Sequence, residues 1–117
     1  MTEIPIRSSK DKFFRQYLSF LSPMIKVDGR ELEVLAELLY YNHELRDVNP
    51  EHRWKLIFDY DTKIKIRNKL NMSEASLNNH FSSLRKKNII VNNTITKKLL
   101  VYPTRNYELK FKFIFSS

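Results

Sequence analysis

Residues 66–90 have the sequence IRNKLNMSEASLNNHFSSLRKKNII, and this stretch decides the fold. Its residue pattern predicts four consecutive elements. These are a helix that ends at Leu70, a turn over 71–73, a second helix over 73–87 and a β-branched strand over 89–91. A helix, a tight turn, a second helix and a strand in this order suit a protein that presents one helix to a partner.

The second of these helices has the clearest local signals. Leu77, Phe81 and Leu84 recur at i, i+4 and i+7, which predicts a narrow buried face. Ser73 stands where an N-cap residue accepts a backbone N–H, and Asn88 stands where a helix ends in the left-handed conformation. The face opposite the buried one is polar, so we expect it to lie in solvent or against a polar partner.

The whole chain has the composition of a single globular domain. Its 117 residues are 42% hydrophobic and 29% charged, which supports a core and excludes a disordered chain. No apolar run reaches the ~18 residues of a transmembrane helix, and residues 1–9 lack the apolar core of a signal peptide. The chain has no cysteine, which excludes disulfides and thiolate metal sites. We therefore expect a cytoplasmic protein with no membrane partner.

The positive charge is concentrated in the second half of the chain. Residues 1–59 hold nine Lys and Arg against ten Asp and Glu, whereas residues 60–117 hold twelve against three. The net charge of +8 therefore comes entirely from the half that contains the two predicted helices and their turn. A polyanion is the natural partner for such a half, because each cation that neutralises a phosphate releases counterions.

The N-terminal half predicts further helices. An amphipathic helix over 11–21 is expected to end at Pro23, because proline breaks helices. The next helix is expected over 30–41, with Asp28 as its N-cap and Glu31 as the partner in a capping box.

The middle and the end of the chain are less uniform. Residues 50–58 fit a helix or, from Trp54 onward, a strand, and a basic helix is expected over 62–70. After the strand at 89–91 we expect a turn at Asn92-Asn93, a wing over 92–98, a returning strand over 99–102 and a final alternating strand over 107–115.

Residues 30–102 resemble a winged helix-turn-helix domain of the kind found in bacterial and phage DNA-binding proteins. The match lies in the helix at 31–39, the helix at 66–70, the recognition helix at 73–87 and the strand at 88–91. The resemblance implies a mainly α fold with a small β-sheet (an α+β domain). It also implies that the recognition helix enters the major groove of double-stranded DNA.

The resemblance also implies an organisation along the chain. The winged helix-turn-helix domain covers 28–103, an arm and a helix precede it over 1–27, and a strand extends the same domain over 104–117. The interval at 42–60 is longer than in many family members. The two additions at the ends are candidate surfaces for a homo-oligomer or a protein partner.

The recognition helix supplies the candidate DNA contacts. Asparagine can pair with adenine through two hydrogen bonds, and small polar side chains let a helix sit deep in the groove. We therefore predict base contacts from Ser76, Asn79 and Ser83. Nine cations in the two helices and the wing are the predicted contacts to the DNA backbone: Lys63, Lys65, Arg67, Lys69, Arg85, Lys86, Lys87, Lys97 and Lys98. The competing interpretation of these residues is an ordinary solvated surface.

No catalytic pattern is visible in the sequence. Asp59 and Asp61 flank one tyrosine without a third carboxylate nearby, so a metal site is not expected. His43, His52 and His80 are scattered, and we expect each to be a surface or edge histidine. With one glycine, no glycine-rich phosphate loop can form. We therefore expect neither an enzyme nor a bound cofactor.

Two functions remain open from the sequence. The first is a DNA-binding protein, either a transcriptional regulator or an accessory of replication or packaging. The second is a non-enzymatic phage structural or adaptor protein, located in the virion, that uses the winged helix for protein contacts. In that case the surface of Phe13, Tyr17 and Phe20 and the strand at 107–115 would bind partner subunits.

Overall fold

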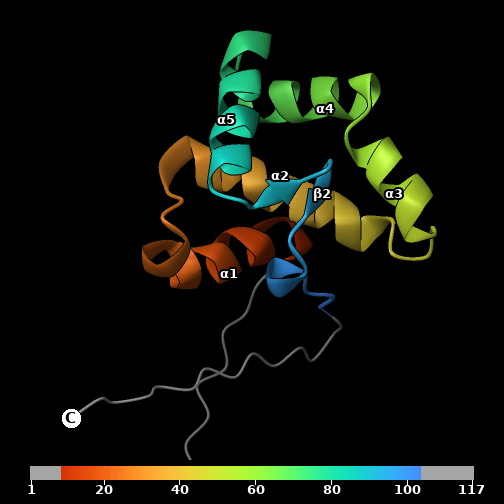
Figure 1. Cartoon of the computed structure of the whole chain (residues 1–117), viewed down its shortest axis with the longest axis horizontal. Helices are drawn as coiled ribbons and strands as arrows, with labels where there is room; N and C mark the ends of the chain where they lie inside the picture. Colours follow the sequence, from red (N-terminus) through yellow and green to blue (C-terminus); the bar gives the residue numbers. More distant parts are fainter. Residues whose placement is uncertain (1–8, 104–117) are drawn as a thin grey trace, which may run out of the picture.

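The computed structural model describes residues 9–103, which form five α-helices followed by a small antiparallel hairpin (Figure 1). This confirms the predicted class, mainly α with a small β-sheet. The strand predicted over 107–115 lies outside the described residues, as does most of the N-terminal arm. The elements are α1 (Lys10–Ile25), α2 (Gly29–Glu44), α3 (Pro50–Ile57), α4 (Tyr60–Leu70), α5 (Glu74–Lys86), β1 (Ile90–Val91), β2 (Thr94–Ile95) and a 3-10 helix, η1 (Lys97–Leu99).

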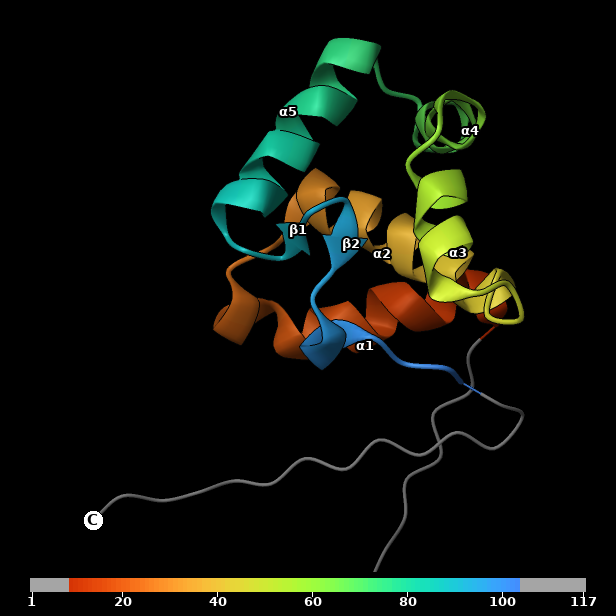
Figure 2. The ribbon, with the colours of Figure 1, turned by 45° about the vertical axis from the view of Figure 1, so that its right-hand side comes forward.

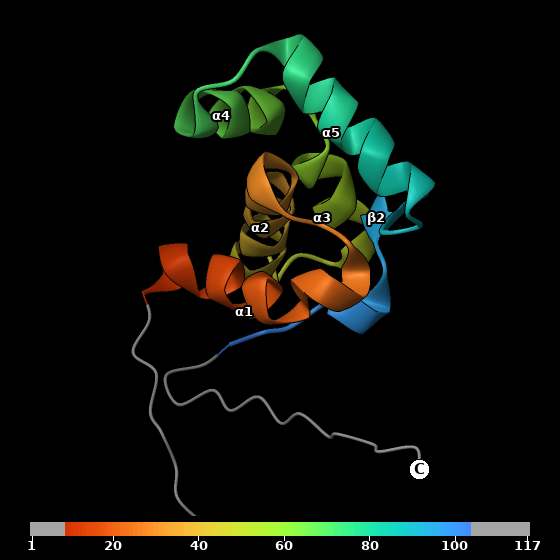
Figure 3. The same cartoon turned by 90° about the vertical axis from the view of Figure 1, so that its left-hand side faces the viewer.

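Helix α2 is the centre of the molecule. It contacts α1 on one side and α3, α4 and α5 on the others. Figure 3 shows α4 and α5 as an outer layer above α2, with α1 below it. The successive residues Val34, Leu35 and Ala36 are therefore all buried, although they lie about 100° apart around the helix. A helix that is apolar around most of its circumference is stable only in such an enclosed position.

Helix α1 does not end before Pro23, as the sequence predicted, but continues to Ile25. A proline one turn from the end removes a single helical hydrogen bond, and the contact of Ile25 with the core keeps the last turn in place. The helix ends instead at Lys26, whose φ of 57° is left-handed and whose N–H donates to the carbonyl of Ser22.

The predicted capping box at the start of α2 was wrong. Asp28 occupies the N-cap position, but its side chain makes no capping hydrogen bond. Glu31 instead accepts a hydrogen bond from Lys87, so its carboxylate is turned away from the helix end. Gly29 follows with a φ of 54°, a conformation that glycine adopts without strain, and it is the one glycine of the chain.

Residues 50–58, for which helix and strand were both open, form α3 up to Ile57. The side chain of Asn49 accepts the His52 N–H at 3.1 Å, and Pro50 takes the first helical position. This start fits proline's fixed φ and its missing N–H, so the local chemistry favours helix.

A buried arginine joins α3 to the end of α2. Arg53 is 7% exposed, and its guanidinium donates to main-chain carbonyls in the loop that follows α2. It also donates to the Asn42 Oδ1 atom at 3.1 Å and to the Tyr102 hydroxyl at 3.2 Å. The carbonyl acceptors belong to Leu45, Arg46 and Val48. One side chain therefore closes the α2–α3 loop and holds the last described segment of the chain.

Asparagine supplies the left-handed residues in the turns around α4 and α5. Asn71 (φ 53°) ends α4, and Asn88 (φ 60°) follows α5, as the sequence predicted for the latter. The N–H of the next residue reaches back in each case, from Met72 to the Arg67 carbonyl and from Ile89 to the Leu84 carbonyl, both at 3.0 Å. These are Schellman-type helix ends.

The hairpin is shorter than the predicted wing. Asn92 and Asn93 both have positive φ, so they form the two-residue turn that matches the twist of the strands. Each strand is only two residues long (Figure 2). The predicted strand over 99–102 is absent: Lys97–Leu99 forms η1, because this turn brings Leu99 into the core, where its carbonyl accepts the Tyr17 hydroxyl.

Candidate nucleic-acid interface

Helix α5 has one buried face and one open face. The Ser73 hydroxyl accepts the Ser76 N–H at 3.1 Å, which confirms the predicted cap. Leu77, Phe81 and Leu84 are buried, which confirms the predicted apolar face. The side chains exposed to solvent on the rest of the helix are Glu74, Ala75, Asn78, Asn79, Ser82, Arg85 and Lys86.

The three predicted base contacts do not share the same exposure. Asn79 is exposed, whereas Ser76 and Ser83 are half-buried at the edges of the open face. Asn78, which is not among the predicted contacts, is also exposed. The two neighbouring amides therefore place groups that can both donate and accept hydrogen bonds on the open face of α5.

A cleft of about 230 Å³ lies between α4 and the first turns of α5. Lys63 and Arg67 come from α4, one turn apart, and face Asn78 from α5 across it. The Lys63 ammonium lies 5.7 Å from the centre of the Phe81 ring. The remaining lining residues of this α4–α5 cleft are Tyr60, Ile64, Glu74 and Leu77.

The cleft was not predicted from the sequence, although part of its signal was available. Lys63 and Arg67 are four residues apart and therefore share a helix face, which the alternating pattern of this segment obscured. Lys65 lies on a different, exposed face. The Arg67 Nε atom is buried and has no hydrogen-bond partner among residues 9–103, so the guanidinium has donor capacity to spare.

Two of the nine predicted backbone contacts are bound to glutamates of α2. The Lys69 ammonium lies 2.9 Å from the Glu37 carboxylate, and the Lys87 ammonium lies 2.7 Å from the Glu31 carboxylate. Both pairs join the outer layer to α2, and Glu37 is almost fully buried. Burial raises the pKa of the nearby Tyr41, and the Glu37 charge adds to this shift. Lys69 and Lys87 therefore stabilise the packing of the outer layer on α2.

Lys97 and Lys98 are exposed, but they lie in η1 and not in the hairpin. Figure 2 shows η1 beside α1, on the side of the molecule away from the α4–α5 cleft. The hairpin tip presents Asn92 and Asn93 in their place.

The described residues carry nine cations from position 60 onward, against only Asp61 and Glu74. Seven of these cations make no ion pair with an Asp or Glu among residues 9–103. They are Lys63, Lys65, Arg67, Arg85, Lys86, Lys97 and Lys98. The excess of positive charge predicted from the sequence therefore remains available on the surface.

His43 and Asp59 take part in packing and in helix capping. His43 is buried against Phe14, with ring centroids 6.0 Å apart, so its predicted surface position was wrong. It lies on α2, which the other helices enclose. Asp59 caps α4 by accepting the Thr62 N–H at 2.8 Å. Within residues 9–103, no three His, Asp or Glu side chains gather as a metal site would require.

None of the described helices combines the length and the apolar character that crossing a membrane requires.

Removing the cap of α5 tests how firmly the local sequence holds this helix. The Ser73→Ala variant is expected to lose about 1 kcal/mol of unfolding free energy, because the Ser76 N–H loses its acceptor. Urea unfolding followed by circular dichroism measures this loss. Ser82→Ala is the matched control on the open face, and we expect its unfolding free energy to change by less than about 0.5 kcal/mol. Equal losses in the two variants would contradict the capping role.

Comparison of the chain with protein-family models, with curated proteins and with solved structures finds no match in any of the three.

Proposed function

We propose that this protein binds double-stranded DNA as a winged helix-turn-helix protein, with α5 in the major groove. One observation carries the proposal: α5 lies in the outer layer (Figure 3), and the polar side chains opposite its buried face are exposed from its first turn to its last. A helix about 10–12 Å in diameter fits a major groove that is about 12 Å wide. The turn at Asn71 and the hairpin after α5 stand where this fold would have its turn and its wing.

The distribution of charge along α5 supports the same docking. Lys63 and Arg67 lie beside the first turns of the helix, and Arg85 and Lys86 lie in its last turn. Asn78 and Lys86 are eight residues apart, or about 12 Å along the helix axis. Cations near the two ends can therefore contact the phosphates on either side of the groove, while Asn78 and Asn79 reach the base edges.

The proposal assigns separate roles to these groups. Asn79, with Asn78 beside it, reads base edges, and Ser76 and Ser83 make secondary contacts at the sides of the helix. Lys63, Arg67, Arg85 and Lys86 bind phosphate, and Lys65 lies beside them. Lys69, Lys87, Lys97 and Lys98 are left out, because the first two are paired with glutamates and the last two lie in η1. A transcriptional regulator or an accessory of replication or packaging would use such an interface.

A salt titration tests the proposal. Affinity for a 30-base-pair duplex, measured by fluorescence anisotropy, is expected to fall steeply between about 50 and 200 mM salt. Lys86→Ala should weaken binding to all sequences alike and reduce the salt slope by about one. Asn79→Ala should instead relax the preference among duplexes selected from a randomised pool, by about 1–3 kcal/mol at the base that it contacts.

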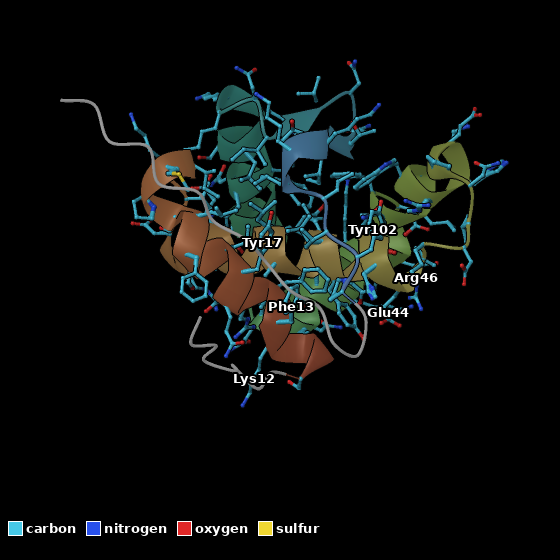
Figure 4. The ribbon with its side chains drawn as sticks, turned by 90° about the horizontal axis from the view of Figure 1, so that it is seen from below. Lys12, Phe13, Tyr17, Glu44, Arg46 and Tyr102 are labelled. Atoms are coloured by element: carbon cyan, nitrogen blue, oxygen red, sulfur yellow. The ribbon has the colours of Figure 1, made fainter. Side chains whose placement is uncertain are left out.

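The matched control removes the same charge from the other side of the molecule. Lys12 is exposed on α1, in the layer opposite α4 and α5 (Figure 4). Lys12→Ala should leave affinity and salt slope unchanged. If no duplex binds at about 50 mM salt, or if Lys12→Ala and Lys86→Ala weaken binding equally, the proposed interface is wrong.

A structural or adaptor protein remains the second candidate, favoured by a different observation. Phe20 is 56% exposed and Met24 is 69% exposed, one turn apart on α1. They form a small apolar patch of the kind that protein partners cover. Tyr17, which the sequence placed on this surface, is buried and donates to the Leu99 carbonyl. Failure of DNA binding in the titration would favour this candidate.

A further inference from the structure

A second hollow, larger and more apolar than the α4–α5 cleft, lies between α3 and the hairpin. Its volume is about 960 Å³. Trp54 lines it from α3 and Phe58 from the turn that follows α3. Ile95 lines it from β2, and Leu100 and Tyr102 line it from the last described segment. We call it the α3–hairpin groove. Apolar side chains on three sides make it suitable for an apolar occupant.

The hairpin has an open edge at this groove. The Thr96 N–H donates to the Ile89 carbonyl at 2.9 Å, and the next pair toward the turn is Ile90 with Ile95. Hydrogen-bonded and non-hydrogen-bonded pairs alternate in an antiparallel ladder, so the N–H and C=O of Ile95 point away from β1. Neither group has a hydrogen-bond partner among residues 9–103.

An unpaired strand edge beside an apolar groove is suited to one kind of occupant, an extended segment with alternating apolar side chains. Such a segment gains main-chain hydrogen bonds from the edge and fills the groove with every second side chain. Ile95 combines both requirements, because its side chain is buried while its backbone polar groups are open toward the groove.

The chain itself contains such a segment. Tyr107, Leu109, Phe111, Phe113 and Phe115 alternate with mainly charged residues. The segment lies outside the described residues, but the chain leading to it is described up to position 103. Tyr102 lines the groove, and the five residues from there to position 107 can span up to about 17 Å. A connection this short gives the segment a high effective concentration at the groove of its own molecule.

We propose that residues 107–115 add to β2 of the same molecule as a third strand, pairing with Ile95 and covering Phe58 and Tyr102 in the α3–hairpin groove. The alternate large side chains occupy the groove, and Glu108, Lys110 and Lys112 face solvent. This inference does not depend on the proposed function, because the groove contains none of the cations assigned to DNA.

Two readouts in the full chain test the added strand. The first is the amide exchange of Ile95, measured by NMR. It is expected to be at least tenfold slower in the wild type than in the double variant Phe111→Ser/Phe113→Ser. The second is the fluorescence of Trp54, the one tryptophan of the chain. The described residues already bury it (8% exposed), so its emission should stay unchanged in the same variant and serves as a control for an intact groove. The amide of Thr96, already bonded to Ile89, is the internal control for an intact hairpin.

The matched control changes the opposite face of the segment. Lys110→Ser/Lys112→Ser should leave the Ile95 exchange rate and the Trp54 emission as in the wild type. Equal Ile95 exchange in the wild type and the phenylalanine variant overturns the proposal. Equal effects of the two double variants also overturn it.

A third measurement does not depend on the phenylalanine variant remaining folded. The chain has no cysteine, so Ser116→Cys can carry a single nitroxide label. Quenching of Trp54 fluorescence that is independent of protein concentration supports the strand added within one molecule. No quenching, or quenching that grows with concentration because a second copy supplies the segment, contradicts it.

Discussion

Replacing Arg53 with methionine is expected to lower the free energy of unfolding by about 3 kcal/mol or more, since a buried charged donor is lost. The carbonyls of the α2–α3 loop and the Asn42 side chain would remain buried without their donor. Methionine keeps the apolar stem of the side chain, so the loss reports mainly the hydrogen bonds. Urea unfolding followed by circular dichroism gives the value, against a total of about 5–15 kcal/mol for a typical domain.

Arg46 provides the matched control for this substitution. It is exposed, and its guanidinium donates a single hydrogen bond to the His43 carbonyl. Arg46→Met is therefore expected to cost less than about 1 kcal/mol. A loss below about 1 kcal/mol in Arg53→Met as well would mean that water replaces the guanidinium at those carbonyls, and that Arg53 does not organise the loop.

The Phe81→Ala substitution is expected to cost about 3–5 kcal/mol, the range for removing a fully buried aromatic ring. Phe81 is 1% exposed at the centre of the buried face of α5. Its ring packs edge-on against Phe58 at 5.7 Å, so the cavity left by alanine would lie between α5 and the start of α4. Urea unfolding measures the loss, and α5 is the helix that it would loosen most.

Phe20→Ala is the control, because more than half of that ring is exposed. The same deletion there is expected to cost less than about 1 kcal/mol. Comparable losses in the two variants would show that the α5 face is not the packed seam that its burial indicates.

Local chemistry explains what could be predicted from the sequence. Leu77, Phe81 and Leu84 are spaced so that any helix over this segment places them together, and Ser73 and Asn88 act on the backbone within a few residues. These signals need no knowledge of the tertiary structure. The helices and their class were therefore predictable, whereas the winged helix-turn-helix fold stays a prediction.

The features that the sequence did not reveal depend on residues far apart in the chain. Lys69 and Lys87 looked like free surface cations, but each meets a glutamate more than thirty residues away on α2. No local sequence pattern marks Arg53, yet it is buried by the α2–α3 loop and Tyr102. Pro23 failed to end its helix because Ile25 packs against the core. Contacts between distant residues decide where these side chains lie, and the periodicity of the sequence carries no information about those contacts.

The central position of α2 has a consequence for local motion. Since α2 packs against all four other helices, its backbone amides can reach water only when the whole domain opens. α4 is held mainly by Ile66, Leu70 and the Lys69–Glu37 pair, so it can detach while α2 stays folded. Amide exchange is therefore expected to be slowest in α2, where its rate reports unfolding of the whole domain. The amides of α4 are expected to exchange much faster. A ligand at the α4–α5 cleft would slow exchange in α4 first.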